Sequence, residues 1–361
     1  MDKRNSSKRT VVRIKDIAQK ANVSTGTVDR VLHNRGRVSD EVSERVLRIA
    51  KEMNYEPNLL ARALVSKKEY RIAAVIPDPS VDAYWEDPKN GIAKAEAELR
   101  QYGVWVDQFL FSQYSVDSFK EAAEKVSVSG YDGILIAPIF YKESLAYLSK
   151  WKRQNIPFNL FNTHIPDYEP LAYIGQDSYQ SGFLAAKLLH YGHPTPATFI
   201  VAHIDEDVPN SSHLIRKEQG FIDYFEQHGN GQFRIAHADL KYSSAKEHFR
   251  TLITNLLNEN PDTRGIFVTN SKAFTLAEYL FENKLDNIHL VGYDLIKQNL
   301  AFLEKGTINF LINQNPKRQG YYGIQLLIDH LLFKKNIQPI KYLPLDIITQ
   351  ENLHYYIESE I

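Results

Sequence analysis

The spacing of apolar residues near the N-terminus constrains the fold of this chain more than any other feature. An apolar stripe at helical spacing predicts a first helix and consists of Ile14, Ile17, Ala18 and Ala21. Asn22 interrupts the pattern, and Ser24 is a suitable cap for a second short helix that packs through Val28 and Leu32. Two short helices joined by a tight turn predict a helix-turn-helix.

The second of these helices supplies the candidates for contact with DNA. A helix-turn-helix reads the major groove with the N-terminal residues of its second helix. A third helix, from about Asp40 to Met53 with Ser39 as its cap, is expected to support the pair. A three-helix bundle without a DNA-binding role is the alternative, and the basic charge of the segment argues against it. The residues expected at the DNA are Ser24, Thr25, Gly26, Thr27, Asp29 and Arg30.

Charge is distributed unevenly along the chain, although the formal net charge is only −1. Residues 1–71 hold 17 Lys and Arg against 9 Asp and Glu, whereas the other residues hold 26 against 35. We call residues 1–71 the head and the other residues the body. A basic head on an acidic body is typical of a protein whose head binds phosphates and whose body is repelled by them.

Cysteine and long apolar runs are both lacking in the sequence. The first observation excludes disulfides and thiolate metal sites. Without a long apolar run the sequence has neither a signal peptide nor a membrane span, so we expect a cytoplasmic protein without a membrane partner.

From residue 71 onward the pattern changes to short apolar strands that alternate with amphipathic helices. This alternation predicts a doubly wound α/β domain, whose ligands bind beyond the carboxyl ends of the strands. The expected strands are Ile72–Ile76, Gly133–Ala137, Phe158–Phe161, Thr198–Val201, Gly265–Val268 and Leu290–Gly292.

A nucleotide-dependent enzyme is the main rival for such a fold, and its motifs are missing. No Gly-x-Gly-x-x-Gly follows the first strand, and the sequence has no phosphate-binding loop. It also has no Ser/His/Asp signature and no cluster with metal-ligand spacing. We therefore expect no enzyme activity, no catalytic residue, no metal and no cofactor.

The head resembles the lactose-repressor (LacI/GalR) family. The resemblance is carried by Ile-Lys-Asp-Ile-Ala at residues 14–18, Val-Ser-x-x-Thr-Val-x-Arg-Val-Leu at 23–32, Arg-Val-Ser at 37–39 and Tyr-Glu-Pro-Asn at 55–58. It implies that Asn58–Leu64 folds into a hinge helix on the operator and contacts the minor groove through Asn58, Ala61 and Leu64, with Leu64 as an apolar wedge. Asp29 replaces the family's usual serine, which predicts an altered operator preference.

The body, over about residues 71–355, resembles the periplasmic sugar-binding fold in its ribose-binding-like branch. The markers are Asp-Gly-Ile at 132–134, Gly-Gln-Asp at 175–177, Asn-Pro-Asp at 260–262, Val-Gly-Tyr-Asp at 291–294 and Gln-Asn-Pro at 314–316. The resemblance implies two lobes joined by three crossovers. It divides the chain into a helix-turn-helix domain (1–57), a hinge and linker (58–70) and a ligand-binding domain (71–361). The first lobe would hold about 71–177 and 314–331, and the second 178–313 and 332–361.

The same resemblance places candidate ligand-binding residues in the cleft between the lobes. Aromatic rings after the first strand suit the C–H face of a sugar, although they can also be loop anchors. Amide and carboxylate groups suit its hydroxyls. Asp177 also lies near the cleft, and we favour a helix-capping role for it. The candidates are Tyr84, Trp85, Asn162, Arg216, Lys217, Asn270, Asp294 and Gln314, of which Arg216 and Lys217 are alternatives for one basic contact.

Together these patterns predict a ligand-responsive transcription regulator and, more narrowly, a repressor of sugar-utilisation genes. It would bind a pseudo-palindromic operator as a homodimer, with residues 90–102 near the dimer face, and take a small carbohydrate effector. An activator, or a sensor of a nucleoside or phosphosugar, remains an alternative. A transport-type sugar-binding protein or a carbohydrate-processing enzyme fits less well, because of the basic head and the lack of paired catalytic carboxylates.

Overall fold

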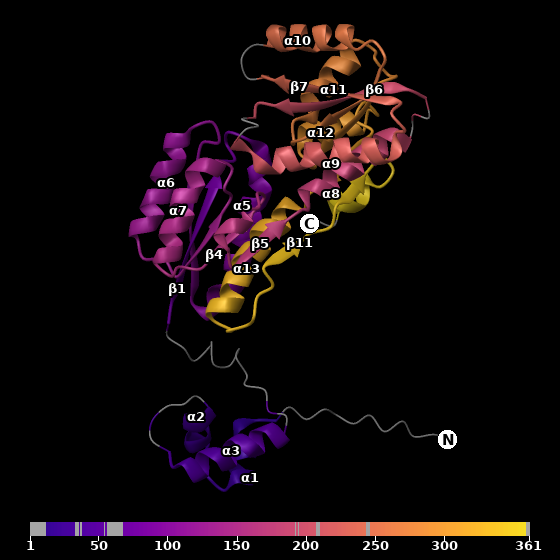
Figure 1. The fold of residues 1–361 in the computed structure, drawn as a ribbon. Helices are drawn as coiled ribbons and strands as arrows, with labels where there is room; N and C mark the ends of the chain where they lie inside the picture. Colours follow the sequence, from indigo (N-terminus) through magenta and orange to yellow (C-terminus); the bar gives the residue numbers. More distant parts are fainter. Residues whose placement is uncertain are drawn as a thin grey trace, which may run out of the picture. The chain divides into compact units, whose positions relative to one another are not determined.

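A computed structural model describes residues 12–32, 36, 38–53, 55, 68–191, 193, 195–206, 210–242 and 246–358. The chain divides into two compact units, residues 1–65 and 66–361 (Figure 1). The predicted minor-groove residues Asn58, Ala61 and Leu64 lie outside the described residues.

The first unit contains the three expected helices, α1 (Ile14–Ala21), α2 (Thr25–Leu32) and α3 (Asp40–Glu52). Ser24 caps α2 as predicted, because its Oγ accepts a hydrogen bond of 3.0 Å from the Thr27 amide. Ser39 occupies the N-cap of α3 as predicted, although its side chain makes no capping hydrogen bond. The helices enclose a small core of Ile17, Ala18, Ala21, Val28, Val46, Ile49 and Ala50.

The second unit has two lobes, each built on a six-stranded sheet. The first sheet is all parallel, with the order β11-β5-β4-β3-β1-β2. Its strands are β1 (Tyr70–Pro77), β2 (Val104–Phe111), β3 (Gly133–Ile136), β4 (Phe158–Phe161), β5 (Ala172–Gly175) and β11 (Ile340–Tyr342). Its helices are α5 (Glu86–Leu99), α6 (Val116–Val128), α7 (Tyr141–Arg153) and α13 (Pro316–Leu331), and Figure 1 shows α6 and α7 together on one side of the sheet.

The second lobe repeats this plan with the order β12-β10-β9-β8-β6-β7, in which only β12 is antiparallel to its neighbour. Its strands are β6 (Ala197–Ile204), β7 (Phe233–Leu240), β8 (Thr263–Val268), β9 (His289–Tyr293), β10 (Phe310–Asn313) and β12 (Asp346–Ile348). Its helices are α8 (Ser178–Tyr191), α9 (Ser212–His228), α10 (Lys246–Glu259), α11 (Ala273–Glu282), α12 (Lys297–Leu303) and α14 (Leu353–Glu358). Apolar clusters cover both faces of this sheet, as parallel strands require.

Three crossovers join the lobes, at residues 176–177, 314–315 and 343–345. They are bonded to one another, since the Gln176 side chain donates to that of Gln314, and Asn315 Nδ2 donates to the Pro344 carbonyl over 3.1 Å. Residues 332–361 were expected in the second lobe, and this was wrong for β11. That strand returns to the first sheet and pairs with β5 before the third crossover.

Glycines let the two central helices of each lobe touch through their backbones. A Cβ on Gly182 of α8 would lie 1.7 Å from the Lys217 carbonyl oxygen of α9, and one on Gly220 would lie 2.0 Å from that of Tyr179. In the first lobe, Gly91 of α5 and Gly320 of α13 make the equivalent close approach. Backbone contact of this kind needs residues without a Cβ.

We expect Gly182→Ala to lower the free energy of unfolding by about 1–3 kcal/mol, because the new methyl group must push α8 away from α9. Urea unfolding followed by circular dichroism measures this change. Gly26→Ala is the control, since its new Cβ would meet no atom closer than 3.7 Å. An unchanged urea midpoint for Gly182→Ala would contradict this interpretation of the helix contact.

Candidate functional site: a cavity between the lobes

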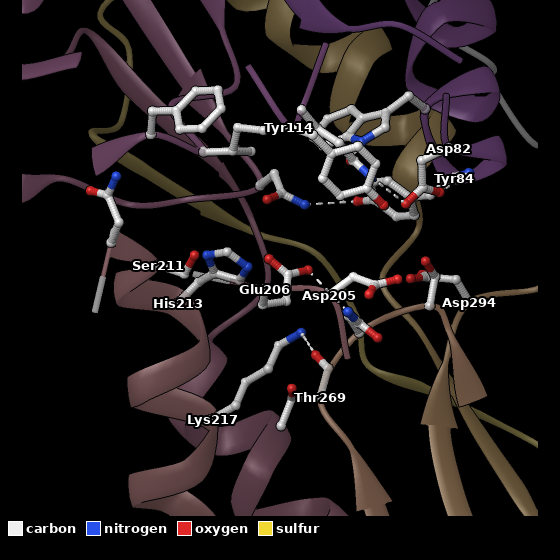
Figure 2. Close-up of a pocket in the computed structure, with 18 of the residues that line it drawn as sticks. Asp82, Tyr84, Tyr114, Asp205, Glu206, Ser211, His213, Lys217, Thr269 and Asp294 are labelled. Atoms are coloured by element: carbon white, nitrogen blue, oxygen red, sulfur yellow. Dashed lines mark hydrogen bonds between the residues drawn. The ribbon is translucent and has the colours of Figure 1, made fainter. Parts of the chain in front are cut away.

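A cavity of about 330 Å³ lies between the two lobes, at the carboxyl ends of their strands (Figure 2). Its volume is at the lower end of the range for small-molecule sites and suits a small ligand. Most of its polar lining lies within three residues of the end of a strand: Gln113 and Tyr114 after β2, Asn162 after β4, Asp205 and Glu206 after β6, Thr269 and Asn270 after β8, Asp294 after β9, and Gln314 after β10.

The first-lobe wall contains the predicted aromatic pair, Tyr84 and Trp85, in a short 3-10 helix (Ala83–Trp85). Their ring centroids are 4.9 Å apart with the planes nearly perpendicular. The Tyr84 hydroxyl accepts a hydrogen bond of 2.9 Å from Asn162 Nδ2, and Trp85 Nε1 donates to Gln113 Oε1 over 3.0 Å. The two rings line the cavity and are also held in the wall, so both roles considered for them are compatible with the structure.

Asp294 is nearly fully buried and lies beside Gln314, which starts the second crossover. Gln314 Nε2 donates to Asp294 Oδ2 over 2.6 Å. Burial raises the pKa of Asp294 to about 7, because the carboxylate has lost most of its water. The backbone at Asp294 has φ 67°, in the left-handed region that Asp and Asn tolerate better than most residues.

Only one of the two candidate basic residues reaches the cavity. Lys217 lies on the buried face of α9, where its Nζ donates to the Thr269 carbonyl over 2.8 Å and stands 3.7 Å from the Tyr293 ring centroid. Burial lowers the pKa of Lys217 to about 8. Arg216 is exposed on α9 and does not line the cavity, so its expected place in the cleft was wrong.

The other two predicted amides also line the cavity. Asn162 has φ 65°, and its backbone amide donates to Gln319 Oε1 over 3.0 Å. Asn270 Nδ2 donates to the Ile204 carbonyl over 2.8 Å and to Glu206 Oε1 over 3.0 Å. Seven of the eight predicted ligand-binding residues therefore meet at one cavity.

The structure adds charged residues that the sequence analysis did not single out. Asp205 and Glu206 follow β6 directly, so the rule that ligands bind beyond strand ends gave a signal for them. His213 lies one helical turn before Lys217 on α9, and burial lowers its pKa to about 3. Asp82 lies in the first lobe, where its side chain accepts the Tyr84 amide at 3.0 Å.

Side chains of the two lobes bond to each other around the cavity. Lys272 Nζ of the second lobe donates to the Tyr114 hydroxyl of the first over 2.8 Å, and it also forms an ion pair of 3.0 Å with Asp205. Thr163 Oγ1 and His213 Nδ1 share a hydrogen bond of 3.1 Å. These contacts hold the lobes together on both sides of a ligand position.

The N-terminus of α8 shows the role that was favoured for Asp177. Asp177 caps α8, because its Oδ1 accepts a hydrogen bond of 3.2 Å from the Gln180 amide.

The helix that was expected to contact DNA has an exposed polar face. On α2, Thr25, Gly26 and Arg30 are exposed, Thr27 and Asp29 are partly buried, and Val28 is in the core. The polar face of α2 is thus available for an external partner.

Two features are missing from the described residues. None of their helices combines the length and the apolar character needed to cross a membrane. None of their His, Asp and Glu side chains gather in threes in a way that would hold a metal ion.

Both units match known families. Residues 72–335 match the family described as periplasmic binding protein domain, and residues 13–58 match bacterial regulatory proteins, lacI family. The HTH-type transcriptional regulator MalR of Streptococcus pneumoniae is 27% identical over 343 residues, 90% of this chain and 99% of the relative. The sucrose operon repressor of Streptococcus mutans is 27% identical over 356 residues, 95% of this chain and 100% of the relative.

A solved structure shares the fold of the second unit. It is described as a putative LacI transcriptional regulator from Bacteroides fragilis and is 29% identical, with a TM-score of 0.74 over 80% of this chain and 100% of that chain. The chain belongs to the periplasmic-binding-protein domain family, which its residues 72–335 match, and it carries a lacI-family DNA-binding domain at residues 13–58. It is a DNA-binding transcription regulator and not an enzyme, and the predicted family and fold class are confirmed.

Proposed function

We propose that this regulator is a cytoplasmic homodimer that represses sugar-utilisation genes and leaves its operator when a small carbohydrate fills the cavity. The observation that carries the proposal is the cavity itself, which the same chain joins to a lacI-family DNA-binding domain. The relatives include a sucrose operon repressor and a ribose operon repressor, whose names point to the same class of effector.

On the DNA side, the second helix would read one half-site of a pseudo-palindromic operator. The exposed side chains of Thr25 and Arg30 support this role. Two half-sites require two copies of the chain, which supports a homodimer. Asn58, Ala61 and Leu64 are proposed to reach the minor groove, on the ground of the family resemblance alone.

On the effector side, the lining suits a polyol. Carboxylate and amide groups bind adjacent hydroxyls, and the Tyr84 and Trp85 rings give an apolar surface for the C–H face of a sugar. Lys217 would act as the basic contact. The residues proposed to bind the sugar are Tyr84, Trp85, Asn162, Lys217, Asn270, Asp294 and Gln314.

Closing of the lobes would link the two functions. A ligand that contacts both lobes stabilises the closed arrangement only by as much as it prefers that arrangement to the open one. Couplings of this kind amount to about 1–3 kcal/mol in typical allosteric proteins.

The experiment that tests the proposal is a screen of neutral sugars by thermal shift on the whole chain. Each hit is followed by fluorescence anisotropy on operator DNA selected from genomic fragments. We expect at least one sugar to stabilise the protein and to reduce its operator affinity. If no sugar in the screen raises the melting temperature, the proposed carbohydrate effector is wrong.

We expect Tyr114→Phe to favour the open arrangement of the lobes, because the variant loses the hydroxyl that accepts from Lys272 of the other lobe. One lost hydrogen bond of this kind amounts to about 0.5–1.5 kcal/mol, so sugar affinity should fall by roughly 2- to 10-fold. Isothermal titration calorimetry measures the affinity, and small-angle scattering measures the opening. Tyr355→Phe, at an exposed position, is the control. Unchanged affinity in both variants would show that this contact does not hold the lobes together.

A further inference from the structure

Carboxylates outnumber basic groups on the described lining of the cavity. The four carboxylates and the two lysines are Asp82, Asp205, Glu206 and Asp294, and Lys217 and Lys241. His213 adds no positive charge near pH 7, because burial lowers its pKa to about 3. Burial also raises the pKa of Glu206, and it raises that of Asp294 to about 7, so the excess of negative charge that a ligand meets is greatest above pH 7.

The lysines at and beside the cavity each have a hydrogen-bond partner in its wall. Lys217 Nζ donates to the Thr269 carbonyl at the foot of the cavity and lies against the Tyr293 ring (Figure 2). Lys272 is paired with Asp205 at 3.0 Å, which neutralises that carboxylate. Lys241, which is exposed, donates to the backbone carbonyl of Glu206 over 3.0 Å.

Glu206, Asp294 and Asp82 are the described lining carboxylates that side-chain amides hold, and Gln113 Nε2 donates to Asp82 Oδ2 over 2.9 Å. Asn270 Nδ2 donates to Glu206 Oε1, and Gln314 Nε2 donates to Asp294 Oδ2. An amide fixes the position of a carboxylate without cancelling its charge. Figure 2 shows Glu206 and Asp205 side by side in the middle of the cavity, with Asp294 at one end.

This lining is unfavourable for a ligand that carries a phosphate or a carboxylate group. Phosphate sites are built from arginine forks, lysines or the amides at a helix N-terminus. The described lining holds no arginine, since Arg216 is on the surface, and both of its lysines already donate to backbone carbonyls. Like charges brought together in a partly buried site repel strongly, and this repulsion is a common device for rejecting a wrong ligand.

We infer that Glu206 selects the effector by charge, so that the cavity accepts uncharged and amine-bearing sugars and rejects phosphosugars and sugar acids. The inference rests on the proposed function, because it specifies which carbohydrates enter the same cavity. It also decides between a neutral sugar and a phosphosugar as the effector, which the sequence left as alternatives.

The test compares sugars that differ only in charge. Series are built on glucose, galactose, ribose, maltose and sucrose, each with its phosphate ester, and for the hexoses also with the amino sugar and the uronic acid. Isothermal titration calorimetry measures their affinities for the whole chain and for Glu206→Gln, which keeps an oxygen for Asn270. Glu226→Gln, at an exposed position of α9, is the matched control. Glu206→Ala gives a second measurement if the first variant does not fold.

In the unmodified chain we expect the neutral or amino member of a series to bind at least 10-fold more tightly than its anionic members. Removal of the Glu206 charge should reduce that ratio by about 10-fold, and the control should leave it unchanged. The inference is overturned if an anionic member binds as tightly as the neutral one. It is also overturned if the ratio of neutral to anionic affinity is unchanged in both Glu206 variants. Either result leaves the proposed function standing. If no member of any series binds, the proposed function is overturned together with the inference.

Discussion

Arg30→Ala should weaken operator binding more than any other single change considered for this protein. Arg30 is exposed on α2, on the face that carries Thr25 and Gly26. A bidentate contact from arginine to a base pair contributes about 1–3 kcal/mol of discrimination. A dimer loses the contact in both half-sites, so the loss is about 2–6 kcal/mol, or roughly 30-fold or more in affinity.

Fluorescence anisotropy on operator and on scrambled duplexes at fixed salt measures this effect. Arg48→Ala, at an exposed basic position of α3, removes the same charge from the same domain and is the matched control. The account expects Arg30→Ala to lose operator affinity much more than affinity for scrambled DNA. An equal loss on both duplexes, or a loss equal to that of Arg48→Ala, would mean that Arg30 contacts phosphates only.

Asp294→Asn should remove most of the sugar affinity while leaving the fold intact. The carboxyl group is nearly fully buried at the cavity and is ionised above its pKa of about 7, and a hydrogen bond from a sugar hydroxyl to the ionised group contributes about 1.5–3 kcal/mol. We therefore expect affinity to fall by roughly 10- to 150-fold, measured by isothermal titration calorimetry with the tightest sugar from the screen.

Asparagine is the correct replacement because of the backbone at this position. With φ 67°, alanine would add strain that has nothing to do with the ligand, whereas asparagine tolerates the left-handed region and keeps an acceptor for Gln314. Asp286→Asn, at an exposed position of the same lobe, is the control. If sugar affinity survives Asp294→Asn, the sugar does not use the cavity as proposed.

The sequence predicted the central strands well because they are buried on both faces. Strands β1, β3, β4 and β8 consist mostly of consecutive buried residues, and such runs are easily seen. The edge strands β2 and β7 consist mostly of partly buried and exposed residues, so their pattern is weaker. The short β11 is largely exposed, and only its pairing with β5 assigns it to the first lobe.

The choice between Arg216 and Lys217 could have been made from helical periodicity. Leu214, Lys217, Phe221 and Tyr224 are three or four positions apart and share the buried face of α9. Arg216 falls between them and faces solvent. Glu206 could be placed near the cleft by the strand-end rule, but its position beside Asn270 depends on pairing between β6 and β8, which one sequence does not reveal.

The most direct test of the account is the operator affinity of the unmodified chain and of Asp294→Asn, each measured with and without a saturating amount of the screened sugar. We expect equal affinities for the two proteins without sugar. With sugar, the unmodified chain should lose affinity by about 5- to 150-fold, and Asp294→Asn should keep it at the same sugar concentration. If the sugar binds the unmodified chain through Asp294 and operator affinity does not change, the cavity does not control DNA binding and the account is contradicted.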